Sequence, residues 1–191
     1  MTASRTWTAW SCTVRLTVDD PAVLGAACGE LKALMDRVDK AASRFRPDSE
    51  LSVVNTRAGA LVPVSRLLVD LVDVSLVAAQ MSGGAVDPTV GRAMRAIGYD
   101  TDFSLVASDG GPIELRLEPI PGWAAIELSV ARREVRIRRG VELDLGSTAP
   151  PVTRAARRAA AIASARSGLI ETRSPACALS ATISLSSRNR L

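Results

Sequence analysis

Three short segments of the sequence carry residue types that could bind or transform a nucleotide. The first is SGGAVDPTVG, residues 82–91, in which adjacent glycines let the backbone approach a ligand closely. The Asp87–Pro88 order predicts a helix over 88–98 with Asp87 as its N-cap. Such a helix start offers free N–H groups, and the Asp87 carboxylate could accept from a ribose or an adenine amine. A plain N-cap explains the same residues.

The second segment is VELDLGSTA, residues 141–149. Its alternation of apolar and polar residues predicts a strand over 141–145 that carries Asp144 near its end. Gly146 permits a tight turn, and either of the two hydroxyl residues after it can cap a following helix. The electropositive N-terminus of that helix would suit a phosphate. A carboxylate at the end of a strand is as often structural as functional.

The third segment is RFRPDSELSVVN, residues 44–55. Phe45 could cover a planar ligand, whereas Ser49, Glu50 and Asn55 are typical capping residues. Without the other two segments, this one indicates only a helix break at the proline followed by a short turn capped by Ser49.

The composition excludes several kinds of chemistry. The chain has no histidine, which excludes a Ser-His-Asp triad, a Cys-His pair and an imidazole metal site. A bound metal would therefore lie among oxygens, which favours magnesium or calcium. The three cysteines are odd in number and lack ligand spacing, so we expect incidental thiols. No apolar run has the length of a signal peptide or a membrane span, and a cytoplasmic protein is expected.

Hydrophobic periodicity predicts the elements that must position these segments. Residues 11–19 alternate in the manner of a half-buried strand. Asp20 and Pro21 then begin a helix whose apolar residues recur at helical spacing as far as Phe45. Further along, the pattern predicts buried helix 66–81, a loop over 103–121, and strands over 123–130 and 134–137.

Taken together and in this order, the three segments resemble one family, the FAD:protein FMN transferases, also called ApbE proteins or flavin transferases. The family patterns and their matches here are S-x-[YF]-x-P-x-S-E-[LI]-x-x-x-N at 43–55, P-V-S at 63–65, G-G-A-[FV]-D-P-[TA]-V-G at 83–91, and [LIV]-D-L-G-x-x-A at 143–149. The joint match covers residues 7–149. The resemblance implies an α+β fold of the ApbE type, a mixed sheet with packed helices.

The resemblance also implies a flavin site, residue by residue. The aromatic that covers the flavin matches Phe45, the segment on the adenosine side matches Ala85, Val86 and Asp87, and the strand-end aspartate matches Asp144. The main-chain carbonyl that binds Mg²⁺ matches Ser147. Trp10 stands where the family has a methionine that contacts FAD. No residue is assigned a catalytic role.

The implied reaction is the transfer of FMN from FAD to a Thr or Ser of a target protein with Mg²⁺, releasing AMP. Such a phosphoryl transfer needs charge neutralisation and alignment of the attacking hydroxyl. The expected partners are FAD and a flavin-accepting protein, without nucleic acid and without a membrane span. Aromatic residues are only 3% of the chain, which argues against a base-stacking nucleic-acid platform.

The resemblance stops at a change in charge and composition. Residues 1–149 hold 17 basic and 19 acidic side chains, whereas residues 150–191 hold seven arginines and one acid and are rich in Ala and Ser. Pro150 stands where the family has a phosphate-binding lysine, and proline supplies neither a charge nor an N–H. We therefore expect an ApbE-like domain over 1–149 and a non-homologous tail over 150–191.

Out-of-frame translation from about residue 150 would explain this tail. The 22 Arg against 2 Lys suggest a GC-rich gene, and such a gene read in a wrong frame yields mainly Arg, Ala, Ser and Pro. The ApbE-like domain would then be incomplete and its activity impaired by truncation. The alternative for the tail is a genuine basic helix over 154–166. For the whole chain, the alternatives to a transferase are a non-catalytic flavin-nucleotide-binding remnant and a nucleic-acid-binding module that uses the Arg-rich tail.

Overall fold

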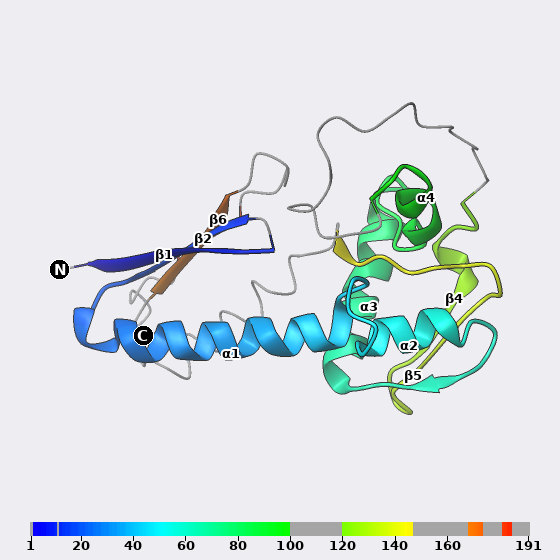
Figure 1. The fold of residues 1–191 in the computed structure, drawn as a ribbon, viewed down its shortest axis with the longest axis horizontal. Helices are drawn as coiled ribbons and strands as arrows, with labels where there is room; N and C mark the ends of the chain where they lie inside the picture. Colours follow the sequence, from blue (N-terminus) through cyan, green and yellow to red (C-terminus); the bar gives the residue numbers. More distant parts are fainter. Residues whose placement is uncertain (1, 11, 100–119, 147–167, 174–180, 185–191) are drawn as a thin grey trace, which may run out of the picture. The chain divides into compact units, whose positions relative to one another are not determined.

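The structure is a computed structural model, and it describes residues 2–10, 12–99, 120–146, 168–173 and 181–184. The chain divides into two compact units, one formed by Met1–Arg37 with Val152–Leu191 and the other by Val38–Pro151. Figure 1 labels most of the helices and strands of both units. The combination of helices with antiparallel sheets confirms the predicted α+β class.

The first unit contains an antiparallel sheet of four strands in the order β1-β2-β6-β7. Their bounds are Ala3–Ala9 for β1, Cys12–Val18 for β2, Gly168–Arg173 for β6 and Ala181–Ser184 for β7. The alternation that predicted a strand over 11–19 is confirmed by β2, in which Val14, Leu16 and Val18 are buried. Strand β1, which pairs with β2 as a hairpin, was missed because most of its residues are exposed and polar.

The helix predicted after Asp20 is confirmed. The Asp20 carboxylate accepts a hydrogen bond from the Ala22 N–H at 3.0 Å and caps a 3₁₀ turn, η1 (Pro21–Val23), that leads into α1 (Leu24–Ala42). One stripe of α1 is buried, with members at helical spacing: Ala27, Cys28, Leu31, Leu34, Met35 and Val38. Lys32 of the same helix places its Nζ 5.7 Å from the centre of the Trp7 ring on β1.

The second unit packs helices on a small sheet. Strands β3 (Val62–Pro63), β5 (Glu134–Ile137) and β4 (Ile126–Ser129) pair antiparallel in that order, with η3 (Trp123–Ala125) leading into β4. Helix α2 (Glu50–Thr56) contacts β5, and α3 (Arg66–Met81) contacts β4 (Figure 1). The core of this unit is aliphatic, and its fully buried members include Leu51, Val54, Leu68, Val69, Val72, Val135, Ile137 and Leu143.

Two helices of this unit differ from their predicted form. Helix α3 was expected to be buried, yet Val77 and Met81 near its end are exposed. Helix α4 was expected to begin at Pro88 and instead spans Gly91–Ala96. The helix begins later because Val90 forms a parallel bridge with Glu142 and is therefore held outside the helix. Residues 103–119 of the loop predicted over 103–121 lie outside the described residues.

Within the described ranges, no helix has both the length and the apolar character needed to cross a bilayer.

Candidate functional site

A buried arginine joins two of the three sequence segments. Arg44 lies just after α1, and its side chain is 4% exposed. Its Nε donates to Oδ2 of Asp144 at 2.7 Å, and its Nη2 donates to the Tyr99 carbonyl. Because 100 residues separate Arg44 from Asp144, no local pattern in the sequence could have identified this pair.

Two aromatic rings flank the same guanidinium. The Phe45 and Tyr99 rings meet edge to face, with centres 5.4 Å apart and planes at 75°. The central carbon of the Arg44 guanidinium lies 4.3 Å from the centre of the Phe45 ring and 4.7 Å from that of Tyr99. Both the edge-to-face pair and the cation–π contacts are attractive. Phe45 nevertheless stays 37% exposed, so this ring remains accessible to a ligand.

The carboxylate of Asp144 is occupied on both oxygens. Oδ2 accepts from Arg44, and Oδ1 accepts from the Gly146 N–H at 2.7 Å, which fixes the turn over 144–146. The Asp144 N–H donates to the Pro88 carbonyl at 2.9 Å, so this turn is tied to the residue after Asp87. Ser147, the predicted Mg²⁺ contact, lies outside the described residues.

The Asp87 carboxylate connects two backbone segments and does not cap a helix that begins at Pro88. Its Oδ1 accepts from both the N–H and the hydroxyl of Thr89, at 2.8 and 2.6 Å. Its Oδ2 accepts from the Trp123 N–H at 3.1 Å and thereby holds the start of η3. The carboxylate therefore orients two backbone segments, and the prediction of a plain N-cap is wrong because the chain bends toward Glu142 before it becomes helical.

The paired glycines before Asp87 serve the end of α3. Gly83 and Gly84 have φ values of 61° and 87°, and the Gly84 N–H donates to the Ala79 carbonyl at 2.8 Å. This is the left-handed ending that glycine favours after a helix. The Ser82 hydroxyl accepts from the Val86 N–H at 3.0 Å, which turns the chain toward Asp87. Ala85 is exposed and Val86 is half-buried.

Asn55 has a role that sequence reasoning missed. Its side-chain amide donates to the Leu143 carbonyl at 3.1 Å and accepts from the Leu143 N–H at 2.8 Å, as a neighbouring strand would. The expectation that Asn55 caps a helix is therefore wrong, whereas Ser49 does cap α2 by accepting from the Ser52 N–H. The segment 141–145 does not form the predicted strand: it has an isolated bridge from Glu142 to Val90, and its backbone also bonds to Asn55 and Pro88.

Gly91 marks the closest approach between two of these segments. Its N–H donates to the Glu142 carbonyl at 3.0 Å, and a Cβ added at this position would lie 2.8 Å from that oxygen. Only glycine allows the start of α4 to lie so close to the backbone at 142.

Gly91→Ala is therefore expected to lower the free energy of unfolding by about 1–3 kcal/mol, the usual range for overpacking. Urea denaturation measures the change. The matched control is Gly25→Ala on α1, where an added Cβ has nothing within 4 Å and the midpoint should not fall. An unchanged midpoint for Gly91→Ala would contradict the steric argument.

The turn that carries Phe45 is fixed on its other side by Arg46. The Arg46 guanidinium binds both carboxylate oxygens of Asp48, at 3.1 and 2.7 Å, and also Asp39 at 3.2 Å. The hydrogen bond from Arg46 lowers the pKa of Asp48, and the same bond raises the pKa of Arg46. Both groups are exposed, so this pair orders the turn without adding much stability.

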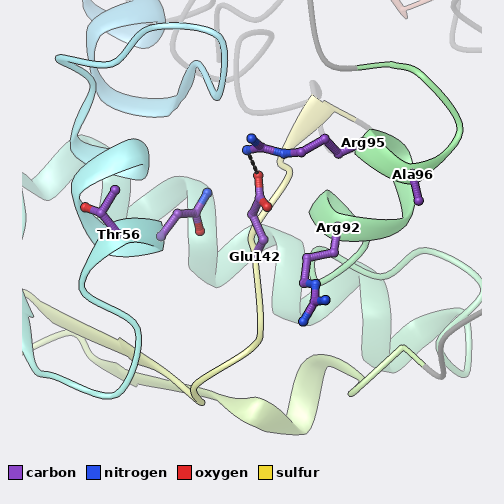
Figure 2. A pocket seen from close by; sticks show the side chains of 6 residues that line it. Thr56, Arg92, Arg95, Ala96 and Glu142 are labelled. Carbon is purple, nitrogen blue, oxygen red and sulfur yellow. Dashed lines mark hydrogen bonds and ion pairs between the residues drawn. The ribbon is translucent and has the colours of Figure 1, made fainter.

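A separate cavity of about 540 Å³ lies at the far end of α2 (Figure 2). Its lining residues are Asn55, Thr56, Arg92, Arg95, Ala96 and Glu142. Figure 2 shows Arg95 directed at Glu142, with which it forms an ion pair. Arg92 donates to the Gly140 carbonyl at 3.2 Å, and the Asn55 amide is committed to Leu143. We place the candidate site around Phe45 instead, because Arg44 links this exposed ring to the Asp144 turn there.

Three of the predicted site residues are thus linked in the second unit. Arg44 connects Phe45 to Asp144, and the bond from Asp144 to the Pro88 carbonyl connects that turn to Asp87. Trp10, by contrast, belongs to the first unit, where it lies exposed in the turn between β1 and β2 with a φ of 51°.

The described residues do not by themselves fit a magnesium ion. In residues 2–10, 12–99, 120–146 and the two short strands after them, no three Asp, Glu, Cys or His side chains lie together as a metal site would require. Asp144 already binds a guanidinium and a backbone N–H, which leaves it poorly placed to coordinate a cation.

Comparison with known proteins gives these linked segments a family. The model of the ApbE family matches residues 8–173, which is most of the chain. The chain belongs to the ApbE family. The matched range continues past residue 149, where the ApbE sequence motifs end, and the domain boundary at that residue stays a prediction.

Individual ApbE relatives agree with this assignment. The FAD:protein FMN transferase of Treponema pallidum is 30% identical over an alignment of 151 residues, which covers 72% of this chain and 40% of that protein. The crystal structure of the Thermotoga maritima ApbE protein matches with a TM-score of 0.74 at 20% identity, over 90% of this chain and 57% of that one. The apo flavinyl transferase ApbE of Pseudomonas stutzeri gives a TM-score of 0.68 at 20% identity, over 90% and 58%.

These structural likenesses confirm the predicted ApbE-like fold. The chain spans 40% of the length of the curated relative and little more than half of the solved ApbE chains.

Proposed function

We propose that this chain is a flavin transferase that binds FAD and moves FMN to a Thr or Ser of a target protein. One observation carries the proposal: the Arg44 side chain links the exposed Phe45 ring to the Asp144 turn, and this turn is bonded to the segment that contains Asp87. Three segments that resemble the flavin-binding motifs of one family thus lie in one unit. The Treponema pallidum relative, named as an FAD:protein FMN transferase, supports the same activity.

In this proposal each segment meets a different part of FAD. The exposed face of Phe45 covers the isoalloxazine, because a flat apolar ring gains most from stacking on another aromatic ring. Ala85, Val86 and Asp87 lie on the adenosine side, where the Gly83–Gly84 turn brings backbone close to the ligand. Asp144 orders the turn that leads to Ser147 and thus acts through its backbone bonds.

The chemistry is the attack of an acceptor hydroxyl oxygen on the phosphorus of the FMN half, with cleavage of the pyrophosphate bond and release of AMP. A Mg²⁺ ion would neutralise phosphate charge during this step. Only the resemblance to the family supports this ion, and Ser147 is its predicted contact. The residues described here contribute ligand binding and orientation.

Titration with FAD tests the binding half of the proposal, because flavin fluorescence changes when an aromatic ring stacks on the isoalloxazine. We expect Phe45→Ala to weaken FAD binding about tenfold, in line with about 1–3 kcal/mol for one stacked ring. Leu61→Ala is the matched control, since Leu61 is another exposed apolar residue of the same unit. Equal affinities for wild type and Phe45→Ala, or no binding by wild type, would overturn the proposal.

A non-catalytic flavin-nucleotide binder is the second candidate, and Pro150 favours it. A proline at the position of the expected phosphate-binding lysine lacks both a cation and an N–H donor. A transfer assay with FAD, MgCl₂ and a threonine-containing acceptor peptide separates the two. Release of AMP with a flavin-labelled peptide supports the transferase, whereas FAD binding without either product supports the binder.

A further inference from the structure

We propose that Arg44 is a positioning residue that sets the Phe45 and Tyr99 rings as one rigid wall of the flavin site before FAD binds. The inference rests on the proposed function for its ligand and goes beyond it in two residues, Arg44 and Tyr99. Neither belongs to the motif positions that suggested the site. Both were found only from their contacts.

The Arg44 guanidinium makes three kinds of contact at once. Its edge donates to the Asp144 carboxylate, another nitrogen donates to the Tyr99 carbonyl, and its central carbon lies under 5 Å from the centres of both rings. A planar fork of N–H groups can make such bonds in its plane and still offer its faces to aromatic rings. A lysine ammonium keeps the charge, but it cannot reproduce this combination.

Because the Arg44 side chain is buried, it can hold the exposed Phe45 ring in one orientation. The Arg44 side chain is 4% exposed, so salt screens its ion pair with Asp144 less than it would screen a surface pair. Phe45, on the other hand, is 37% exposed and lies in a turn between two helices. A half-exposed ring in a turn would sample several rotamers unless neighbours select one, and here Arg44 and Tyr99 are those neighbours.

The consequence for binding is preorganisation. A ring that is already held in one orientation loses little freedom when a ligand stacks on it, and affinity rises for that reason. Loss of Arg44 contacts should therefore weaken FAD binding even where the Phe45 ring itself is intact. Tyr99 contributes as the edge against which Phe45 rests.

The test uses Arg44→Lys, with Arg66→Lys as the matched control, because Arg66 forms an exposed ion pair with Asp70 on α3. The first readout is the nuclear Overhauser effect between the Phe45 and Tyr99 rings. The chain has one tyrosine and two phenylalanines, so selective labelling identifies this signal. We expect Arg44→Lys to lose the signal and to raise the FAD dissociation constant about tenfold, with both readouts unchanged in Arg66→Lys.

A second variant separates positioning from folding. Tyr99→Leu leaves the Tyr99 backbone carbonyl and the Arg44–Asp144 bond in place but removes the edge partner of Phe45, so it should also weaken FAD binding. Wild-type affinity in either variant, or an undiminished ring signal in Arg44→Lys, would overturn the inference. Failure of wild type to bind FAD would overturn the proposed function and the ligand part of this inference, while the ring signal still decides whether Arg44 positions the wall.

Discussion

Replacing Arg44 with methionine is expected to lower the free energy of unfolding by about 3–5 kcal/mol, the range seen when one partner of a buried ion pair is removed. The side chains of Arg44 and Asp144 are 4% and 11% exposed, so the variant leaves a carboxylate without its cation in a nearly dry place. It also removes a donor from the Tyr99 carbonyl. Urea denaturation followed by circular dichroism measures the loss.

A double variant tests whether the unpaired carboxylate is the cause. Adding Asp144→Asn to Arg44→Met removes the uncompensated charge and keeps a side-chain oxygen that can accept from the Gly146 N–H. The double variant should therefore be less destabilised than the sum of the two single variants. Simple additivity would show that the pair is not coupled and would contradict the explanation.

Asn55→Ala is expected to destabilise the protein by about 2–4 kcal/mol, because two part-buried backbone groups of Leu143 lose their partner and each costs about 1–3 kcal/mol when unsatisfied. The segment around Leu143 is not paired by a neighbouring strand, so no ladder compensates for the loss. Urea denaturation gives the free energy, and hydrogen exchange at the Leu143 amide reports the local effect.

Two companion variants sharpen this measurement. Asn55→Asp keeps an acceptor for the Leu143 N–H but replaces the donor to the carbonyl with a negative oxygen, so it should be no more stable than Asn55→Ala. Thr56→Ala, one residue along, removes a hydroxyl that donates only to carbonyls of its own helix and should change stability by less than about 0.5 kcal/mol. Equal stability of all three variants would contradict the role given to Asn55.

Local chemistry made much of the fold predictable. Asp20 and Ser49 cap helices as their residue types and positions predicted, because a cap depends on atoms two or three residues away. The 3.6-residue pattern likewise located α1 and α3, and alternation located β2 and β5. The motif order also led to the family that the comparisons confirm.

What escaped prediction depends on partners far along the chain. The start of α4 is set by the bridge from Val90 to Glu142, and the form of 141–145 is set by Asn55, 88 residues before Leu143. Arg44 lies in a family pattern at a position that the pattern leaves open, so its role became visible only with its contacts to Asp144 and Tyr99. No window of neighbouring residues contains these interactions.

The separation between Arg44 and Asp144 also constrains the order of events during synthesis. Until residue 144 has left the ribosome, Arg44 of a nascent chain lacks its counter-ion Asp144. Phe45 then lacks the orientation that the bonded Arg44 gives it. Closing a loop of 100 residues costs more entropy than closing the local turns around it. The part of the unit around Arg44, Phe45 and Asp144 should consequently be among the last to fold, well after α1 and α2 have become helical.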